Sequence, residues 1–145
     1  MAEGSTALSV IVLSGDYERV HYALALAAAA LAVSRPATLF FTHGAIGALT
    51  TTAAGGRGWH GLPAGGGVDG TGAARDAVFT QRGVGDFETL LQACVELGAR
   101  FIVCEMGLRA QGIDPAMLRP DVPVEIAGIV TLLEATPAGA QLLTL

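Results

Sequence analysis

Lysine is missing from this chain, and charged residues of every kind are scarce. All 8 basic residues are arginine, and charged residues make up only 14% of the sequence, against about a quarter in ordinary soluble domains. Without a primary amine the protein cannot form a Schiff base, use a lysine nucleophile or build a Walker A phosphate loop. The sequence therefore excludes these three kinds of chemistry.

A basic cluster is also missing. The arginines are scattered along the sequence, and the formal net charge is -5. Because nucleic-acid binding depends on a patch of positive charge, we predict no nucleic-acid partner. Hydrophobic residues make up 52% of the chain, more than one small core hides easily, so we predict a homo-oligomer.

Long apolar runs and a secretory signal are absent as well. The longest apolar stretch, residues 22–33, is mostly alanine and is shorter than the roughly 20 residues that span a bilayer. Residues 1–6 lack the basic and then apolar regions of a secretory signal. We therefore predict no membrane association and a reducing, cytoplasmic location, in which both cysteines stay thiols.

Motifs for metals, nucleotides and serine chemistry are not found. The 2 cysteines and 3 histidines occur singly, and no pair has the spacing of zinc ligands. Residues 14–17 lack the glycine pattern of a dinucleotide fingerprint, and the chain has no Gly-x-Ser-x-Gly elbow. We predict neither a metal nor a cofactor.

The sequence does contain an alternation of strand and helix patterns. Short apolar runs predict strands over Leu8 to Leu13, Ala37 to Thr42, Phe101 to Cys104 and Gln141 to Leu145. Apolar residues at helical spacing predict helices from Asp16 to Arg35, from Asp86 to Gly98 and over Val124 to Ala135. This order predicts one α/β domain over residues 1–145, with a mainly parallel sheet of four to five strands between two helical layers.

The segment from Thr50 to Gly85 departs from this pattern. It holds eleven glycines and the only tryptophan, Trp59. A structureless loop of that length is uncommon and is usually a functional lid or a disordered segment. We predict a glycine-rich loop over about 50–85, with a short helix over Thr71 to Gln81, and we expect it to be the most mobile part of the chain.

Cys104 is the candidate nucleophile, because reacting groups gather at the carboxyl ends of strands in open α/β sheets. A helix start directly after it would favour the thiolate. Backbone N–H groups around Met106 and Gly107 would stabilise the anion, with Thr42 or His43 as hydrogen-bond donors. The alternative is that Cys104 is only a buried strand thiol.

Other titratable residues have lesser expected roles. The carboxylate of Glu105 opposes a thiolate next to it, unless it turns to solvent or pairs with Arg109. Cys94 lies on the apolar stripe of its predicted helix and is expected in the core. His21 is expected on a helix surface, and His60 is expected to be exposed within the glycine-rich segment.

Two segments resemble the DsrE/DsrF-like family. The first is residues 8–42, from LSVIVLSGDY to ATLFFT, and the second is residues 86–135, with ELGARFIVCEMGLRAQGI and VEIAGIVTLLEA. The resemblance implies an α/β fold with a five-stranded, mainly parallel sheet and a homo-oligomeric state. It also implies transfer of sulfane sulfur through a cysteine persulfide, with Cys104 at the position of the persulfide cysteine.

This resemblance leaves two functions open. The first is a sulfur-relay protein, a possible sulfurtransferase, which exchanges sulfur with donor and acceptor proteins that carry reactive thiols. The second is a non-catalytic subunit that binds a small ligand or regulates a sulfur-metabolism complex. Activity that survives the loss of Cys104 would favour the second.

Overall fold

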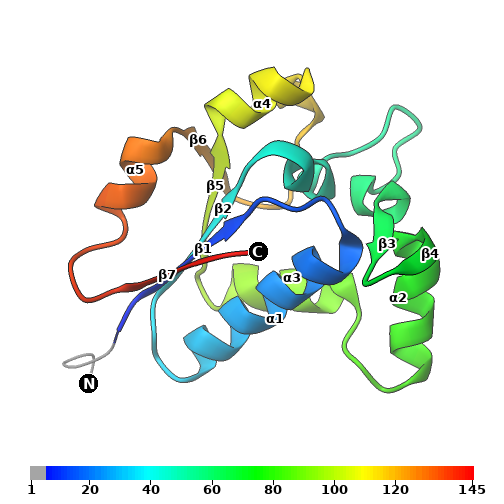
Figure 1. Cartoon of the computed structure of the whole chain (residues 1–145), viewed down its shortest axis with the longest axis horizontal. Coiled ribbons are helices and arrows are strands. Elements are labelled where there is room, and N and C mark those ends of the chain that lie inside the picture. Colours follow the sequence, from blue (N-terminus) through cyan, green and yellow to red (C-terminus); the bar gives the residue numbers. More distant parts are fainter. Residues whose placement is uncertain (1–5) are drawn as a thin grey trace.

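The computed structural model describes residues 6–145 and is built around one parallel sheet (Figure 1). The five strands follow the spatial order β6-β5-β2-β1-β7, and every neighbouring pair is parallel. Their bounds are β1 Leu8–Val12, β2 Ala37–Phe41, β5 Arg100–Cys104, β6 Val124–Ala127 and β7 Gln141–Thr144. The predicted mainly parallel sheet is confirmed. The prediction about a secretory signal concerned residues 1–6, of which 1–5 lie outside the described part.

Helices cover both faces of this sheet, as predicted. The layer on one face consists of α1 (Tyr17–Ala32) and α3 (Phe87–Glu96), while the other face carries α5 (Ile129–Glu134) (Figure 1). The remaining elements near the carboxyl ends of the strands are α4 (Glu105–Gln111) and the 3-10 helices η1 (His43–Leu49) and η3 (Pro115–Met117). Within residues 6–145, no helix combines the length and apolar character needed to cross a bilayer.

The predicted ends of α3 are those that the structure shows. Asp86 caps the helix by accepting hydrogen bonds from the backbone N–H of Thr89 at 3.4 Å and from its hydroxyl at 2.5 Å. Gly98 follows the last turn with a φ of +89°, a left-handed conformation that glycine adopts without steric penalty. Local sequence therefore determines where this helix starts and stops.

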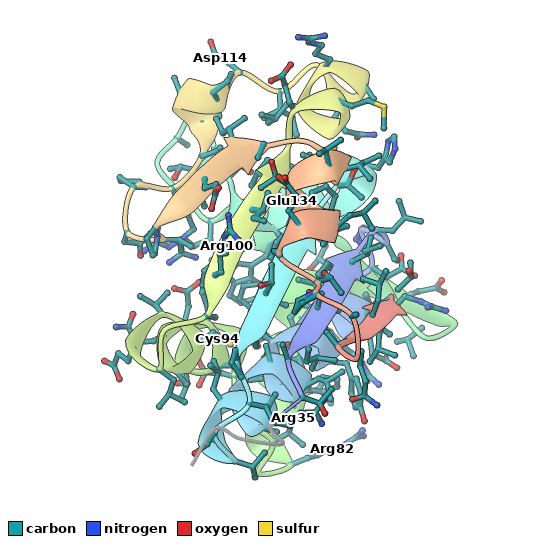
Figure 2. All side chains as sticks on the ribbon, turned by 90° about the vertical axis from the view of Figure 1, so that its left-hand side faces the viewer. Arg35, Arg82, Cys94, Arg100, Asp114 and Glu134 are labelled. Atoms are coloured by element: carbon teal, nitrogen blue, oxygen red, sulfur yellow. The ribbon has the colours of Figure 1, made fainter. Side chains whose placement is uncertain are left out.

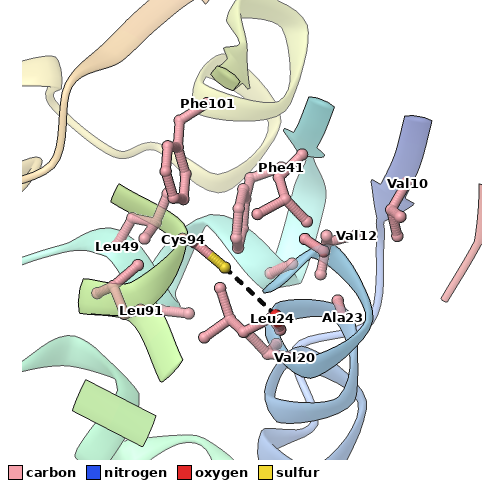
Figure 3. Packing of buried hydrophobic residues seen from close by; sticks show 14 of the residues in the cluster. Val10, Val12, Val20, Ala23, Leu24, Phe41, Leu49, Leu91, Cys94 and Phe101 are labelled. Atoms are coloured by element: carbon pink, nitrogen blue, oxygen red, sulfur yellow. Dashed lines mark hydrogen bonds between the residues drawn. The ribbon is translucent and has the colours of Figure 1, made fainter. Parts of the chain in front are cut away.

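Most of the core lies between the sheet and the layer of α1 and α3 (Figure 3). Side chains that alternate along β1 and β2, such as Val10, Val12 and Phe41, face this layer. Leu24 of α1 and Leu91 of α3 meet them from the other side. The close approach of the helices follows from the alanine-rich face of α1, where Ala23 and Ala27 are fully buried.

The prediction of one helix over Val124 to Ala135 is wrong. Val124–Ala127 is an edge strand paired in register with β5, so that Val124 lies opposite Phe101 and Ala127 opposite Cys104. Gly128 has an extended backbone and α5 begins only after it. The residues of β6 fit either a strand or a helix, and the open edge of β5 decides in favour of a strand.

The segment over residues 50–85 is not one long loop. It forms a 3-10 helix, a two-stranded antiparallel hairpin and the predicted short helix; these are η2 (Gly58–Gly61), β3 (Pro63–Gly65), β4 (Val68–Thr71) and α2 (Gly72–Gln81). Gly65, Gly66 and Gly67 all have positive φ values, which explains the glycine run at the hairpin turn. Mobility of the segment stays a prediction.

Aromatic packing joins this segment to α1 and α3. Trp59 is 4% exposed and its ring centroid lies 5.7 Å from that of Tyr17 and 4.5 Å from that of Phe87. His21 is buried here, with Nε2 2.7 Å from the carbonyl oxygen of Gly85. The prediction of a surface position for His21 is wrong, because residues 50–85 fold over that side of α1.

A buried arginine and Trp59 of this segment bind the same carboxylate of α3. Arg119 is 3% exposed and makes paired hydrogen bonds of 2.7–2.8 Å to the carboxylates of Glu88 and Asp121. Trp59 donates its indole N–H to Glu88 at 2.7 Å. The hydrogen bonds from Arg119 lower the pKa of Glu88 and bring that of Asp121 to about 2.

Candidate functional site

Cys104 is the last residue of β5 and the residue directly before α4, as the sequence predicts. Its backbone is extended and its side chain makes no capping hydrogen bond to the helix. The thiol-bearing residue is only 1% exposed. The strand-end position therefore does not make Cys104 more accessible than Cys94, which is also fully buried.

The direction of the Cys104 side chain follows from alternation along β5. Phe101 and Val103 belong to the core beneath α1 and α3, whereas Ile102 and Cys104 belong to a second, smaller cluster with Phe40 and Leu132. Successive strand side chains point to opposite faces of a sheet. Cys104 therefore faces the side that carries α5, which is the side turned toward the viewer in Figure 2.

Three of the four predicted supporting residues meet at the end of β2. A Cβ atom on Gly107 would lie 2.8 Å from the backbone nitrogen of His43 and 2.9 Å from Oγ1 of Thr42. Such contacts are too short for a real Cβ atom, so only glycine lets the first turn of α4 approach this closely. Met106 differs, since it is 53% exposed.

The loops that follow β1 and β2 also lie in close contact. A Cβ atom on Gly15, which follows β1, would lie 2.8 Å from the carbonyl oxygen of Gly44, which follows β2. The loops after β1 and β2 and the start of α4 thus converge at one edge of the sheet. Among residues 6–145, neither Thr42 nor His43 forms a hydrogen bond to the Cys104 thiol, and their expected role as donors to the anion stays a prediction.

Glu105 is paired, which is one of the two arrangements expected for it. Its Oε1 lies 2.6 Å from Nη2 of Arg109, one helical turn further along α4. Both side chains are more than half exposed. The negative charge beside Cys104 is therefore partly balanced and solvated.

Cys94 is in the core, as predicted. It is fully buried, and its Sγ donates to the carbonyl oxygen of Leu24 at 3.3 Å (Figure 3). Burial raises the pKa of its thiol to about 11. A protonated, enclosed thiol is a poor nucleophile, so Cys94 does not compete with Cys104 for chemistry.

A surface pocket of about 610 Å³ lies beside α4 and the end of β6, but it does not include Cys104. Its lining comprises Glu105, Leu108, Arg109, Gly112, Ile113, Asp114, Pro115 and Ile126.

In the described part of the chain, no three His, Cys, Asp or Glu side chains are grouped so as to hold a metal ion. His60 is exposed, as expected, and its ring packs edge-on against Trp59.

Sequence reasoning missed Leu132, which is 2% exposed and covers the cluster around Cys104 from α5. Its only sequence signal is its place in the apolar run Ile129 to Leu133. That run does not reveal which of its members turns inward. The position of β6 and the length of the connection from β6 to α5 decide which side chain turns inward.

Comparison with known proteins gives one family and two similar folds. The model of the DsrE/DsrF-like family matches residues 7–145. The fold is similar to that of the ychN protein from E. coli, with 18% identity, a TM-score of 0.61, and coverage of 97% of this chain and 99% of that chain. It is also similar to MTH1491 from Methanobacterium thermoautotrophicum, a protein of unknown function, with 14% identity, a TM-score of 0.62, and coverage of 97% and 100%. No curated protein sequence gives a significant match.

Proposed function

Because the chain belongs to the DsrE/DsrF-like family, we propose that it is a sulfur-relay protein that carries sulfane sulfur as a persulfide on Cys104. The observation that carries this proposal is the position of Cys104, at the end of β5 and directly before α4. This is the edge where ligands and reacting groups gather in open α/β sheets. The second thiol, Cys94, is enclosed in the core and protonated.

The proposed reaction needs no cofactor and no external oxidant. The Cys104 thiolate attacks the outer sulfur of a donor persulfide, R–S–SH. The donor S–S bond breaks, a new S–S bond forms to Cys104, and the donor leaves as the thiolate R–S⁻. An acceptor thiolate then attacks the outer sulfur of Cys104–S–SH, takes it away and releases the Cys104 thiolate.

The partners in this proposal are donor and acceptor proteins with reactive thiols. A reducing compartment such as the cytoplasm suits them, because thiols persist there. The separation of the two cysteines supports this location. Cys94 of α3 lies in the core on one face of the sheet, and Cys104 lies in the cluster beneath α5 on the other face, so the fold does not bring them together as a disulfide.

We also propose that the chain forms a homo-oligomer. Large apolar side chains remain exposed on several elements, including Tyr22 of α1, Val68 of β4 and Leu97 at the end of α3. Burying such side chains between copies would remove apolar surface from water. Light scattering at micromolar concentration should give a mass above that of one 14.7 kDa chain, and a monodisperse monomer would contradict this proposal.

Intact-mass spectrometry tests the sulfur-relay proposal directly. After incubation with a persulfide donor and removal of the excess, the wild type should gain one sulfur atom, which a reductant removes. Cys104→Ser should gain none, and Cys94→Ser should load like the wild type. These paired serine variants separate the two thiols with the same atomic change.

The alternative function predicts another pattern. If the wild type stays unloaded with low-molecular-weight and protein donors alike, or if Cys104→Ser still retains the sulfur, the sulfur-relay proposal fails. A subunit that binds a small ligand or regulates a complex would keep its activity without Cys104. Complementation by Cys104→Ser in the cell would therefore favour that reading.

A further inference from the structure

One side chain from a helix completes the apolar cluster around Cys104. Its members Phe40, Ile102 and Cys104, and the partly buried Ile11 and Ala127 packed against them, all come from strands of the sheet. Leu132 is the one member of this cluster that comes from a helix. Leu132 is therefore the side chain through which α5 covers this cluster.

The helix that carries Leu132 is short. α5 has 6 residues, fewer than two turns, and a helix of this length has little stability of its own. Three of its residues, Ile129, Val130 and Leu133, are exposed at 48%, 71% and 57%. Burial of Leu132 is thus the main apolar contribution that holds α5 on the sheet.

Few polar contacts support this attachment. Among the described residues, one hydrogen bond joins residues 129–136 to the sheet, between the hydroxyls of Thr136 and Ser9 at 2.7 Å. The other hydrogen bonds of this segment are local, such as those from Leu132 to Gly128 and from Ala135 to Thr131. Segments with few buried contacts open at a lower free energy than the rest of a fold.

From these contacts we infer that α5 is a displaceable cover that controls access to Cys104, with Leu132 as its plug and the Thr136–Ser9 hydrogen bond as its latch. The closed form keeps the sulfur from solvent and from donors. Reaction occurs from the open form, so its rate is proportional to the population of that form. This inference rests on the proposed function only in that the controlled reaction is sulfur transfer.

Alkylation of the native protein measures the cover without any sulfur donor. We would treat the protein with iodoacetamide and follow both cysteines separately by peptide mass spectrometry. Leu132→Ala should raise the alkylation rate of Cys104 about tenfold or more, because it removes the buried side chain of the plug. Leu133→Ala is the matched control, since it makes the same change on the exposed side of α5, and its rate should stay within about twofold of the wild type.

Cys94 shows whether a variant has merely loosened the whole fold. It belongs to α3 and lies in the other cluster, on the opposite face of the sheet, and its alkylation should stay as slow in Leu132→Ala as in the wild type. Thr136→Val provides a second route, because it removes the hydroxyl of the latch with nearly unchanged volume. It should accelerate Cys104 severalfold and leave Cys94 unchanged.

Three results would overturn the inference. The first is that Cys104 is alkylated as fast in the native protein as in the urea-unfolded protein. The second is that Leu132→Ala and Leu133→Ala raise the alkylation rate of Cys104 equally. The third is that Leu132→Ala and Thr136→Val each raise the alkylation rates of both cysteines in parallel. Persulfide loading of the same variants separates the two proposals. If the wild type never takes up sulfur but the alkylation rates are as expected, sulfur transfer is rejected and the cover is kept. If all variants take up sulfur at equal rates and are alkylated at equal rates, the cover is rejected and sulfur transfer is kept.

Discussion

The two faces of the sheet each enclose one cysteine, but under covers of very different strength. Cys94 belongs to α3 and is buried between the sheet and the layer of α1 and α3, which have 16 and 10 residues. Cys104 lies beneath α5, which has 6 residues. Exposed fractions of 0% and 1% do not distinguish the two thiols. The difference lies in how much structure has to move before each becomes accessible.

The stronger face is also reinforced by residues 50–85. Trp59 packs against Tyr17 of α1 and Phe87 of α3. Outside that segment, Arg119 is hydrogen-bonded to Glu88 of α3. On the α5 face, the Thr136–Ser9 hydrogen bond is the one comparable contact among residues 6–145. The fold thus concentrates its stability on one side of the sheet and leaves the other side able to open.

The largest expected effect comes from removing one leucine on each face. Leu24→Ala should lower the free energy of unfolding by about 3–5 kcal/mol, because fully buried Leu24 lies between the sheet and α3 and its cavity cannot collapse. Leu132→Ala should cost about 2–3 kcal/mol, because the short α5 can settle toward the sheet. Urea unfolding of both variants measures the difference.

Leu133→Ala serves as the baseline, with an expected change below about 0.5 kcal/mol at its exposed position. The comparison of the two faces breaks down if Leu132→Ala costs as much as Leu24→Ala. In that case α5 is packed as firmly as α1.

A smaller effect is expected at Arg119, which tests the reinforcement of the stronger face. Arg119→Ala should lower the free energy of unfolding by about 2 kcal/mol at pH 7, since it leaves two carboxylates without their hydrogen-bond donor. The carboxylates are 38% and 47% exposed and remain solvated, which limits the loss. Arg57→Ala is the control, with contacts to the same carboxylates of 3.6–3.9 Å and an expected change below about 0.5 kcal/mol.

Acid should reduce the difference between the wild type and Arg119→Ala. The pKa values of Glu88 and Asp121 are lowered in the folded state, mainly by hydrogen bonds from Arg119, to about 2 for Asp121. Their contribution to stability is therefore complete above the ordinary carboxyl pKa of about 4 and is lost as the pH falls toward 2. Urea unfolding at pH 7 and pH 3 should show a smaller difference at pH 3, whereas an unchanged difference would mean that Arg119 stabilises by packing alone.

Local patterns in the sequence were enough to predict the strands around the candidate site. The apolar runs that became β1, β2 and β5 end at turn residues, and Cys104 was correctly predicted at a strand end. The cover over Cys104 could not be predicted, because it depends on which side chain of α5 faces inward. Leu132 and Leu133 are adjacent and identical in type, and only their placement relative to the sheet separates them.

Two other features depended on contacts between distant parts of the chain. Val124 to Ala127 fit a helix or a strand until β5 offers an unpaired edge. Arg119 is an isolated charge in the sequence and becomes buried only because Glu88 and Asp121 meet it. Propensity and spacing carry no information about such partners, so the resemblance to a family supplied the overall topology that local patterns left open.

The smallest expected effect concerns Cys94 and alkaline pH, and it tests whether the stronger face stays closed to water. Burial raises the pKa of Cys94 to about 11 from an ordinary value of 9.0. A raised pKa means that the folded state holds the proton more tightly than the unfolded state. The resulting stability is complete below pH 9 and is lost as the pH rises toward 11. The wild type should therefore lose about 1–2 kcal/mol relative to Cys94→Ala across this range.

Urea unfolding at several pH values between 8 and 11, with a reductant present, measures this loss. Comparing the wild type with Cys94→Ala isolates the one thiol, because Tyr17, whose pKa is also raised by burial, and Cys104 are present in both proteins. A constant difference between the wild type and Cys94→Ala from pH 8 to 11 would mean that Cys94 is as hydrated in the folded state as in the unfolded state. The contrast between the two faces would then rest on helix length alone and not on exclusion of water.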